Sequence, residues 1–66
     1  MAREAFKAFL KKNNVKQNDV ADLLGISRAS VSAKAQGKQD FKVREIKKLA
    51  KAYDMEPNEI VNVFLS

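Results

Sequence analysis

The chain has 66 residues, which is enough for one small core and too few for two, so we expect a single domain over residues 1–66. It has no cysteine and no histidine, which excludes disulfides, zinc–thiolate sites and the commonest general base. Its net charge of +5 is uneven, with +4 on residues 1–16, −1 on residues 17–33, +5 on residues 34–51 and −3 on residues 52–66. This surplus favours a polyanionic partner, with an ordinary solvated surface as the alternative.

No apolar run approaches the length of about 18 residues that a membrane span needs. The N-terminal segment MAREAFKAFLKK mixes charges into its first turns, which is unlike a signal peptide. We therefore expect a soluble, complete chain without a membrane partner. A small domain without cysteine fits a reducing cytoplasm as well as any other place.

Apolar residues recur at helical spacing in the first half of the chain. They predict a first helix at about residues 2–13 and a second at about residues 17–24, ended by Gly25, which tolerates positive φ. Ser27 is a good N-cap for a third helix, because its hydroxyl can accept a hydrogen bond from the first turn. Gly37 ends that helix.

The second half of the chain continues the helical spacing and shows no strand-like alternation. A fourth helix is predicted at about residues 43–53, and a short fifth begins at Pro57, a residue suited to the first helical position. The fold class is therefore all-α with short connections. The residues expected to face inward in the first, second and fourth helices are Ala5, Phe6, Phe9, Leu10, Val20, Ala21, Leu23, Leu24, Val43, Ile46, Leu49, Ala50 and Tyr53.

One face of the third helix carries no large apolar side chain. At about 100° per residue, five residues share one arc of that helix, opposite Val31 and Ala35. Facing the interior, this arc would bury a guanidinium and an amide without evident partners, so we expect it to face outward. Small side chains around one arginine allow close approach to a DNA major groove, and a plain solvent-exposed helix is the alternative. The five residues are Arg28, Ala29, Ser32, Ala33 and Gln36.

The run QNDVADLLGISRASVSAKAQGK, residues 17–38, combines a glutamine at the start of the second helix, a Gly-Ile-Ser turn, and Gly-Lys after the third helix. With LAKAYDM at residues 49–55, the pattern resembles the Cro/CI-type (XRE-like) helix-turn-helix family of phage repressors, Cro proteins and bacterial regulators. The resemblance covers nearly the whole chain. It implies a compact five-helix, lambda-repressor-like domain with its helix-turn-helix at about residues 17–36. It also implies a transcriptional regulator that represses by binding a double-stranded DNA operator.

The resemblance further implies that the third helix lies in the major groove, with the second helix above it across the backbone. Arg28, Ala29, Ser32 and Ala33 match the family's base-facing positions. Backbone contacts are implied around the start of the second helix and in the loop after the third, with simple solubility as the alternative for the lysines. These residues are Lys16, Gln17, Ser30, Gln36, Lys38, Gln39 and Lys42.

The sequence departs from the family pattern at three places. A helix 1 arginine and a helix 3 glutamate that many members pair are replaced by Leu10 and Ala35, which we expect to sit close together. Lys34 stands where the family keeps an apolar residue; we expect its stem at the core edge and its ammonium in solvent, with a phosphate contact as the alternative. Lys16 occupies the N-cap of the second helix and cannot supply the usual side-chain acceptor.

The C-terminal stretch EIVNVFLS carries more apolar surface than one short helix can turn inward. Either Phe64 and Leu65 fold back onto the first helix, or part of the stretch is shared with a second copy. Helix-turn-helix proteins usually bind two half-sites as a two-fold dimer. We therefore expect a weak homodimer through Val61, Val63, Phe64 and Leu65.

An enzyme is not expected, and neither is a metal, a cofactor or a small-molecule ligand. The acids Asp19, Asp22, Glu45 and Glu59 form no pattern typical of catalysis or metal binding. A Ser–Lys pair, Ser30 and Lys34, lies on an exposed helix without an oxyanion pocket. The alternative function is a protein-binding module of the same fold, antitoxin-like or antirepressor-like.

Overall fold

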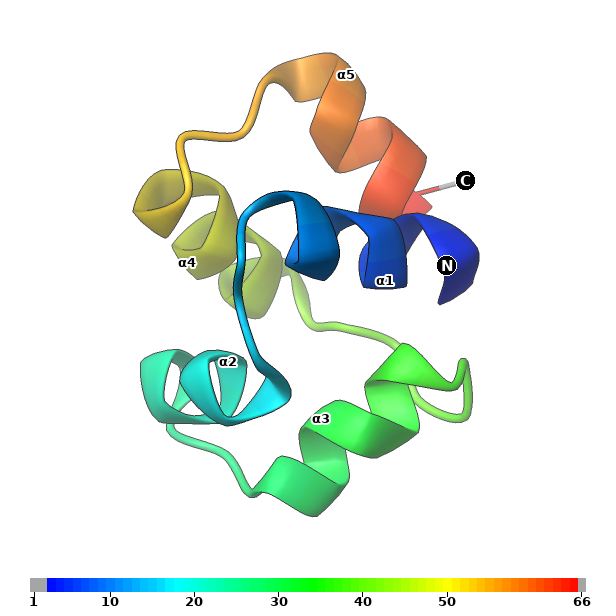
Figure 1. Cartoon of the computed structure of the whole chain (residues 1–66), viewed down its shortest axis with the longest axis vertical. Coiled ribbons are helices and arrows are strands. Elements are labelled where there is room, and N and C mark those ends of the chain that lie inside the picture. Colours follow the sequence, from blue (N-terminus) through cyan, green and yellow to red (C-terminus); the bar gives the residue numbers. More distant parts are fainter. Residues whose placement is uncertain (1–2, 66) are drawn as a thin grey trace.

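The computed structural model describes residues 3–65, and all regular structure in that part of the chain is helical. Figure 1 shows α2 and α3 together in the lower half of the molecule, below α1, α4 and α5. The predicted all-α fold with five helices is confirmed. In chain order the helices are α1 (Arg3–Lys12), α2 (Gln17–Leu24), α3 (Arg28–Ala35), α4 (Val43–Ala52) and α5 (Pro57–Ile60), which continues into the π-helical segment η1 (Val61–Leu65).

Local hydrogen bonds place the boundaries of α2 and α3 where the sequence predicted them. The Lys16 side chain makes no cap; instead the Lys16 backbone N–H donates to Asp19 Oδ2 at 2.9 Å, half of a capping box. Gly25 ends α2 in the left-handed conformation, at φ 67°. Ser27 caps α3, because its Oγ accepts the Ser30 N–H at 3.1 Å.

One core joins the helices. Phe6, Val20, Val31 and Leu49 are fully buried, one from each of α1 to α4. The loop between α3 and α4 adds Phe41, whose ring centroid lies 5.0 Å from that of Phe6. Nearly all the large apolar side chains are therefore used to hold the helices together. The remaining buried apolar residues are Phe9, Leu10, Ala21, Leu24, Ala35, Met55, Val63 and Phe64.

Two predictions concern individual apolar residues. Leu10 on α1 and Ala35 on α3 are both buried in this core, and the two helices pack against each other. That the two side chains touch stays a prediction. The prediction for Val43 is wrong: its side chain is 69% exposed, because it lies in the first turn of α4, beyond the part of the helix that the core covers.

The C-terminal segment divides between the core and the surface. Val63 and Phe64 are buried, and η1 packs against α1. Val61 and Leu65 are 48% and 66% exposed. The fold-back interpretation therefore holds for Phe64 but is wrong for Leu65, and two of the four residues expected at a dimer interface, Val63 and Phe64, are consumed by the chain's own core.

Candidate nucleic-acid interface

The two helices α2 and α3 are joined by a three-residue turn with a defined geometry. Gly25 adopts its left-handed conformation, and the next N–H, that of Ile26, donates to the Ala21 carbonyl at 3.1 Å. Ser27 then starts α3 at once. Because Val20 and Val31 are both fully buried, the inner faces of α2 and α3 are fixed to the same core. The result is a rigid helix-turn-helix unit.

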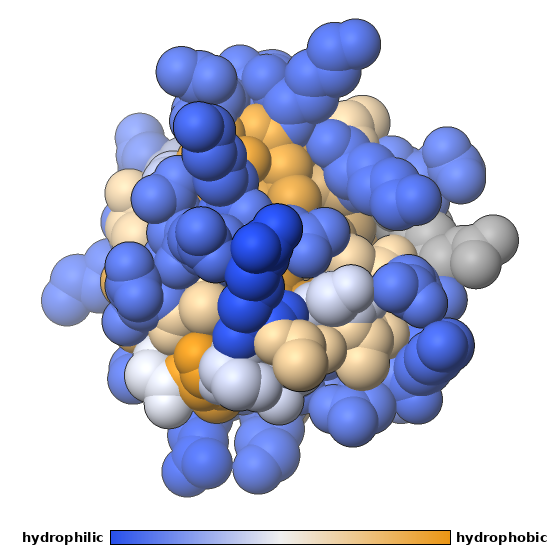
Figure 2. All heavy atoms as spheres, turned by 60° about the horizontal axis from the view of Figure 1, so that its bottom comes forward, coloured by the Kyte–Doolittle hydropathy of each residue, from blue (hydrophilic) through white to orange (hydrophobic). Residues whose placement is uncertain are grey.

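The outer face of α3 is open, as its composition predicted. Arg28, Ala29 and Gln36 are exposed, and Ser32 and Ala33 are partly exposed. Figure 2 views the molecule from the side of α2 and α3: a strongly hydrophilic side chain stands at the centre, pale and tan side chains lie beside and below it, and further hydrophilic ones lie at the edge. A surface of this kind lets the helix axis come close to a partner while one guanidinium reaches out from the first turn.

The polar residues beside this face lie in two groups. Lys16 is exposed and Gln17 partly so at the start of α2, while Lys38, Gln39 and Lys42 are exposed in the loop between α3 and α4. The two groups flank α3 in the chain, one before it and one after.

Two further candidates, Ser30 and Gln36, already make contacts within α3. The Ser30 hydroxyl accepts a hydrogen bond from Ser27 Oγ at 3.0 Å and is therefore part of the N-cap. The Gln36 amide Nε2 donates to Ser32 Oγ at 3.1 Å. These bonds orient Ser32 and Gln36 on the outer face of the helix.

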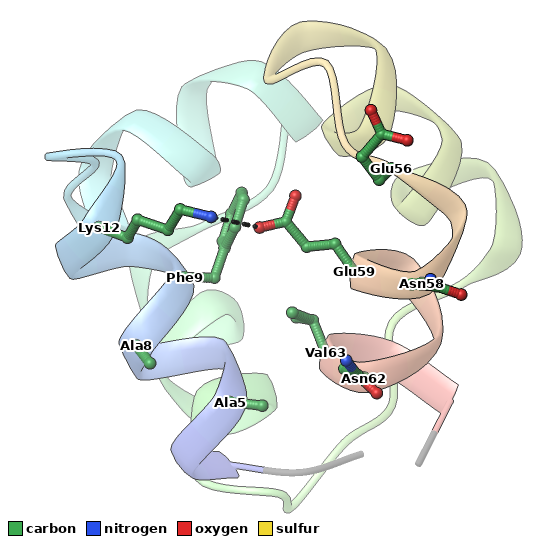
Figure 3. Close-up of a pocket in the computed structure, with 9 residues that line it drawn as sticks. All are labelled: Ala5, Ala8, Phe9, Lys12, Glu56, Asn58, Glu59, Asn62 and Val63. Carbon is green, nitrogen blue, oxygen red and sulfur yellow. Dashed lines mark ion pairs between the residues drawn. The ribbon is translucent and has the colours of Figure 1, made fainter.

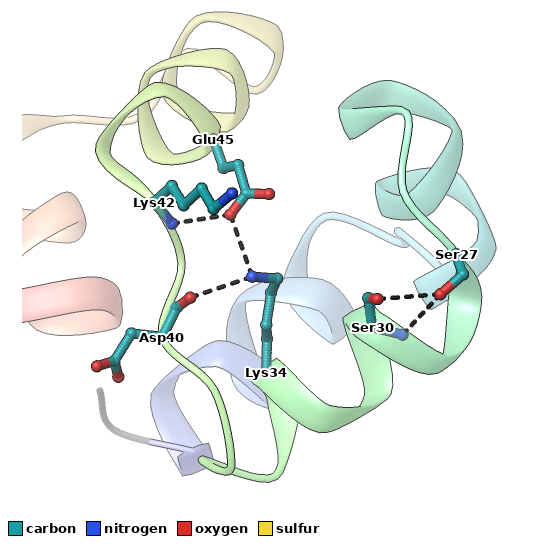
Figure 4. A network of polar contacts seen from close by, with 6 residues as sticks. All are labelled: Ser27, Ser30, Lys34, Asp40, Lys42 and Glu45. Atoms are coloured by element: carbon teal, nitrogen blue, oxygen red, sulfur yellow. Dashed lines mark hydrogen bonds and ion pairs between the residues drawn. The ribbon is translucent and has the colours of Figure 1, made fainter.

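A buried polar cluster holds the loop that follows α3 (Figure 4). Lys34 Nζ lies 3.3 Å from Glu45 Oε1 and donates to the Asp40 carbonyl at 3.1 Å. Glu45 Oε1 also accepts the Lys42 backbone N–H at 2.8 Å, and the Lys34 ammonium stands 5.6 Å from the centre of the Phe41 ring. These contacts connect Lys34 on α3 to the loop and to Glu45 in the first turn of α4.

The cluster corrects the prediction for Lys34. Its ammonium does not reach solvent and is not placed to contact a phosphate, since the side chain is 6% exposed and its partner Glu45 8%. Sequence reasoning missed this pair. Two signals could have found it: a lysine three positions after the buried Val31, and an acid at the third position of α4, typical of a reciprocal helix cap.

The charge state of Glu45 follows from its surroundings. Burial by itself raises the pKa of this carboxyl, but the Lys42 N–H and the Lys34 ammonium bind its charged form, with Coulomb attraction from both lysines. The net effect lowers the pKa below its ordinary value of 4.5. Glu45 is therefore ionised at neutral pH, and the pair is a true ion pair.

An open pocket lies between α1 and α5, away from the helix-turn-helix (Figure 3). It has a volume of about 550 Å³, an apolar floor that includes Phe9 and Val63, and a rim with an ion pair of 3.6 Å between Lys12 Nζ and Glu59 Oε2. Within residues 3–65, no group of three acidic side chains is placed to hold a metal ion. None of the helices in the same stretch has the length and apolar character of a membrane span.

Two helices joined by a three-residue turn, the second of which presents an open polar face, are the arrangement of a helix-turn-helix protein. The chain matches the helix-turn-helix family over residues 6–60 and belongs to it, in the Cro/CI-type, XRE-like form that the sequence pattern indicated. It is thus a DNA-binding helix-turn-helix regulator, of a family that is generally not enzymatic. Comparisons with curated proteins and with solved structures gave no significant match.

Proposed function

We propose that this regulator represses transcription by occupying a DNA operator, with α3 in the major groove and α2 across the backbone above it. The observation that carries the proposal is the open face of α3, where the Arg28 guanidinium is surrounded by alanine and serine side chains, with one glutamine at the end of the helix. The major groove of B-DNA admits an α-helix, and a slim helix face lets it approach the base edges.

Arg28 is the proposed reader of sequence. It is the first residue of α3 and exposed, so its planar fork can bridge the O6 and N7 acceptors of a guanine. Ala29 would contact a thymine methyl group, and Ser32 a base edge or a bridging water. Ala33 would contribute shape and methyl contact only. Each copy would thus make one strong base contact, that of Arg28, and sequence preference should be strongest at that base pair.

Contacts with the phosphates would fix the position of α3 without reading sequence. Gln17 and Lys16 at the start of α2 are proposed to hold one phosphate, where the helix dipole also favours an anion. Lys38 and Lys42, in the loop after α3, are proposed to bind phosphates at a second place on the DNA backbone. The other proposed backbone contacts are Ser30, Gln36 and Gln39.

The proposal includes a weak homodimer that places two copies on two half-sites one DNA turn apart, as in a phage or bacterial regulator acting in the cytoplasm or nucleoid. A lone module has little specific affinity, so a second copy is needed. The exposed apolar side chains that remain for this contact are Val61 and Leu65, on η1. Both lie on the segment opposite the helix-turn-helix in Figure 1.

The test is a selection of bound sequences from a random duplex pool, followed by titration of the enriched duplex at several salt concentrations. We expect one enriched motif, two-fold symmetric if a dimer binds, and a steep loss of affinity with salt because counterions are released. A random pool without enrichment, or a salt-independent affinity, would contradict the proposal. That result would favour a protein-binding module of the same fold.

A further inference from the structure

Lys34 lies on the inner side of the recognition helix, next to Ala35 and one turn after Val31, both of which are buried. Its ammonium does not point to the outer face that carries Arg28. It points across the start of the loop, to the Asp40 carbonyl at 3.1 Å and the Glu45 carboxylate at 3.3 Å (Figure 4). A direct contact with DNA is therefore excluded by its burial, and any effect on binding must pass through the loop.

The loop between α3 and α4 is held at nearly every residue. Gly37 and Lys38 donate their N–H groups to the carbonyls of Lys34 and Ala33, at 3.1 and 2.9 Å. Further on, the Asp40 carbonyl binds the Lys34 ammonium. Lys34 thus binds the loop twice, with its backbone carbonyl at the start and its side chain near the end.

The end of the loop is fixed by the same cluster. The Phe41 ring is buried against Phe6 and lies beneath the Lys34 ammonium, with 5.6 Å between Nζ and the ring centre. The Lys42 N–H donates to Glu45. The Lys34–Glu45 pair therefore ties the recognition helix, the loop and the start of α4 into one unit.

We propose that Lys34, through its bonds to the Asp40 carbonyl and Glu45, is a positioning residue for DNA binding, which holds residues 39–42 of the loop at the height where Lys42 meets the DNA backbone while Arg28 is in the groove. This inference rests on the proposed function and deepens it. Lys38 keeps its place without the pair, because its own N–H is bonded to the Ala33 carbonyl, whereas Lys42 is tied to α3 only through Asp40 and Glu45. Without the pair, Lys42 remains a cation near DNA but no longer keeps a fixed distance from α3.

A double-mutant cycle tests this role, with the dependence of affinity on salt as the readout. Each phosphate contact contributes about 0.9 to the slope of log K against log salt. Lys42→Met in the unmodified background should lower the slope by about 0.9. Lys34→Met should lower it by at least as much, and Lys42→Met added to Lys34→Met should change it by less than about 0.3.

The matched control is Lys47→Met, which removes the same charge from an exposed position on the outer side of α4. Its slope should stay close to that of the unmodified protein. Equal slope losses for Lys34→Met and Lys47→Met would mean that net charge alone is responsible. An additive effect of Lys42→Met in both backgrounds would likewise overturn the positioning role.

A loss of folding cannot mimic the expected result, because a second variant removes both charges. Lys34→Met with Glu45→Leu leaves no unpaired buried charge, and such replacements are often neutral or stabilising. Circular dichroism must show this variant folded, and its slope should still fall by at least about 0.9 because the Asp40 carbonyl has lost its donor. A folded double variant with an unchanged slope would overturn the inference and leave the proposed function standing. If the unmodified protein itself showed no salt-dependent duplex binding, both would be refuted.

Discussion

Lys34 on α3 and Glu45 on α4 form an ion pair of 3.3 Å that is almost completely shielded from water. Transferring two charges into a protein interior is costly, and their attraction offsets that cost only when additional hydrogen bonds are present. Here the Asp40 carbonyl accepts from the ammonium, and the Lys42 N–H donates to the carboxylate. No buried side-chain nitrogen or oxygen among the described residues lacks a partner. These bonds therefore offset the free-energy cost of burying the two charges. Removing either residue would leave the other as a buried charge without its ionic partner.

The first prediction concerns the dependence of stability on pH. The pKa of Glu45 is lower in the folded state than its ordinary value of 4.5, so its stabilising contribution is present above about pH 4.5 and is lost as the pH falls through the folded pKa. Urea unfolding at several pH values should show this loss in the unmodified protein. Glu45→Gln should be less stable at neutral pH, because the charge-assisted bonds weaken, and should lose less on acidification.

The comparison isolates Glu45 because glutamine keeps an oxygen that can accept the Lys42 N–H. The other acids, such as Asp19 and Glu59, are present in both proteins and contribute equally. Two curves that run parallel from pH 7 to about pH 3 would show that Glu45 does not carry the effect.

The second prediction separates sequence reading from backbone binding. Arg28→Ala should lower affinity for the selected duplex by about 1 to 3 kcal/mol and relax the preference at one base pair. Lys38→Ala should weaken binding to all duplexes alike and reduce the salt slope by about 1. Electrophoretic or fluorescence titrations with the selected and a scrambled duplex measure both effects. Equal losses on the two duplexes for both variants would contradict the role given to Arg28.

The third prediction concerns the C-terminal segment. Phe64→Ala should destabilise the fold by about 3 to 5 kcal/mol, because a buried aromatic ring is removed. That ring lies edge-on to Phe41, with 5.2 Å between centroids. Leu65→Ala should change stability by less than about 0.5 kcal/mol, since Leu65 is largely exposed. Urea or thermal unfolding of the two variants, side by side, makes the comparison.

The fourth prediction uses this difference to test the dimer. Val61→Ser with Leu65→Ser removes the exposed apolar groups of η1 and leaves Val63 and Phe64 in the core. Sedimentation equilibrium at high concentration should show weaker association of this variant and little change in its folding. An identical sedimentation pattern for variant and unmodified protein would remove the C-terminal dimer from the proposal, whether the pattern is monomeric or dimeric.

The features of this fold that could be predicted from the sequence are those set by residues close together in the chain. Ser27, Gly25 and Pro57 act within one turn of the chain, and they set helix ends where the sequence placed them. Helical spacing likewise identifies most of the core, because a core face is a property of a single helix. The open face of α3 was predictable for the same reason.

Where prediction from the sequence failed, the answer depended on another element. Val43 has the spacing of a core residue, but whether anything covers the first turn of α4 is decided by the neighbouring helices. Lys34 follows Val31 on an inward face, yet its burial requires Glu45 and the Asp40 carbonyl, which are brought to it only by the path of the loop. The division of η1 into Phe64 inside and Leu65 outside depends on α1, which packs against one side of η1 and leaves the other side exposed.

The last prediction concerns the turn between α2 and α3. Gly25 has φ +67°, and a Cβ atom added there would meet no heavy atom within 4 Å. The cost of Gly25→Ala is therefore conformational strain alone, about 1 to 2 kcal/mol, while asparagine, which visits this region more readily, should lose less. Thermal unfolding should rank the three proteins glycine, asparagine, alanine in decreasing stability. Because the strained variants gain no clash, α3 keeps its position, and their affinity for the selected duplex should be unchanged where they are fully folded. A loss of affinity without a loss of stability would mean that the turn itself contacts DNA.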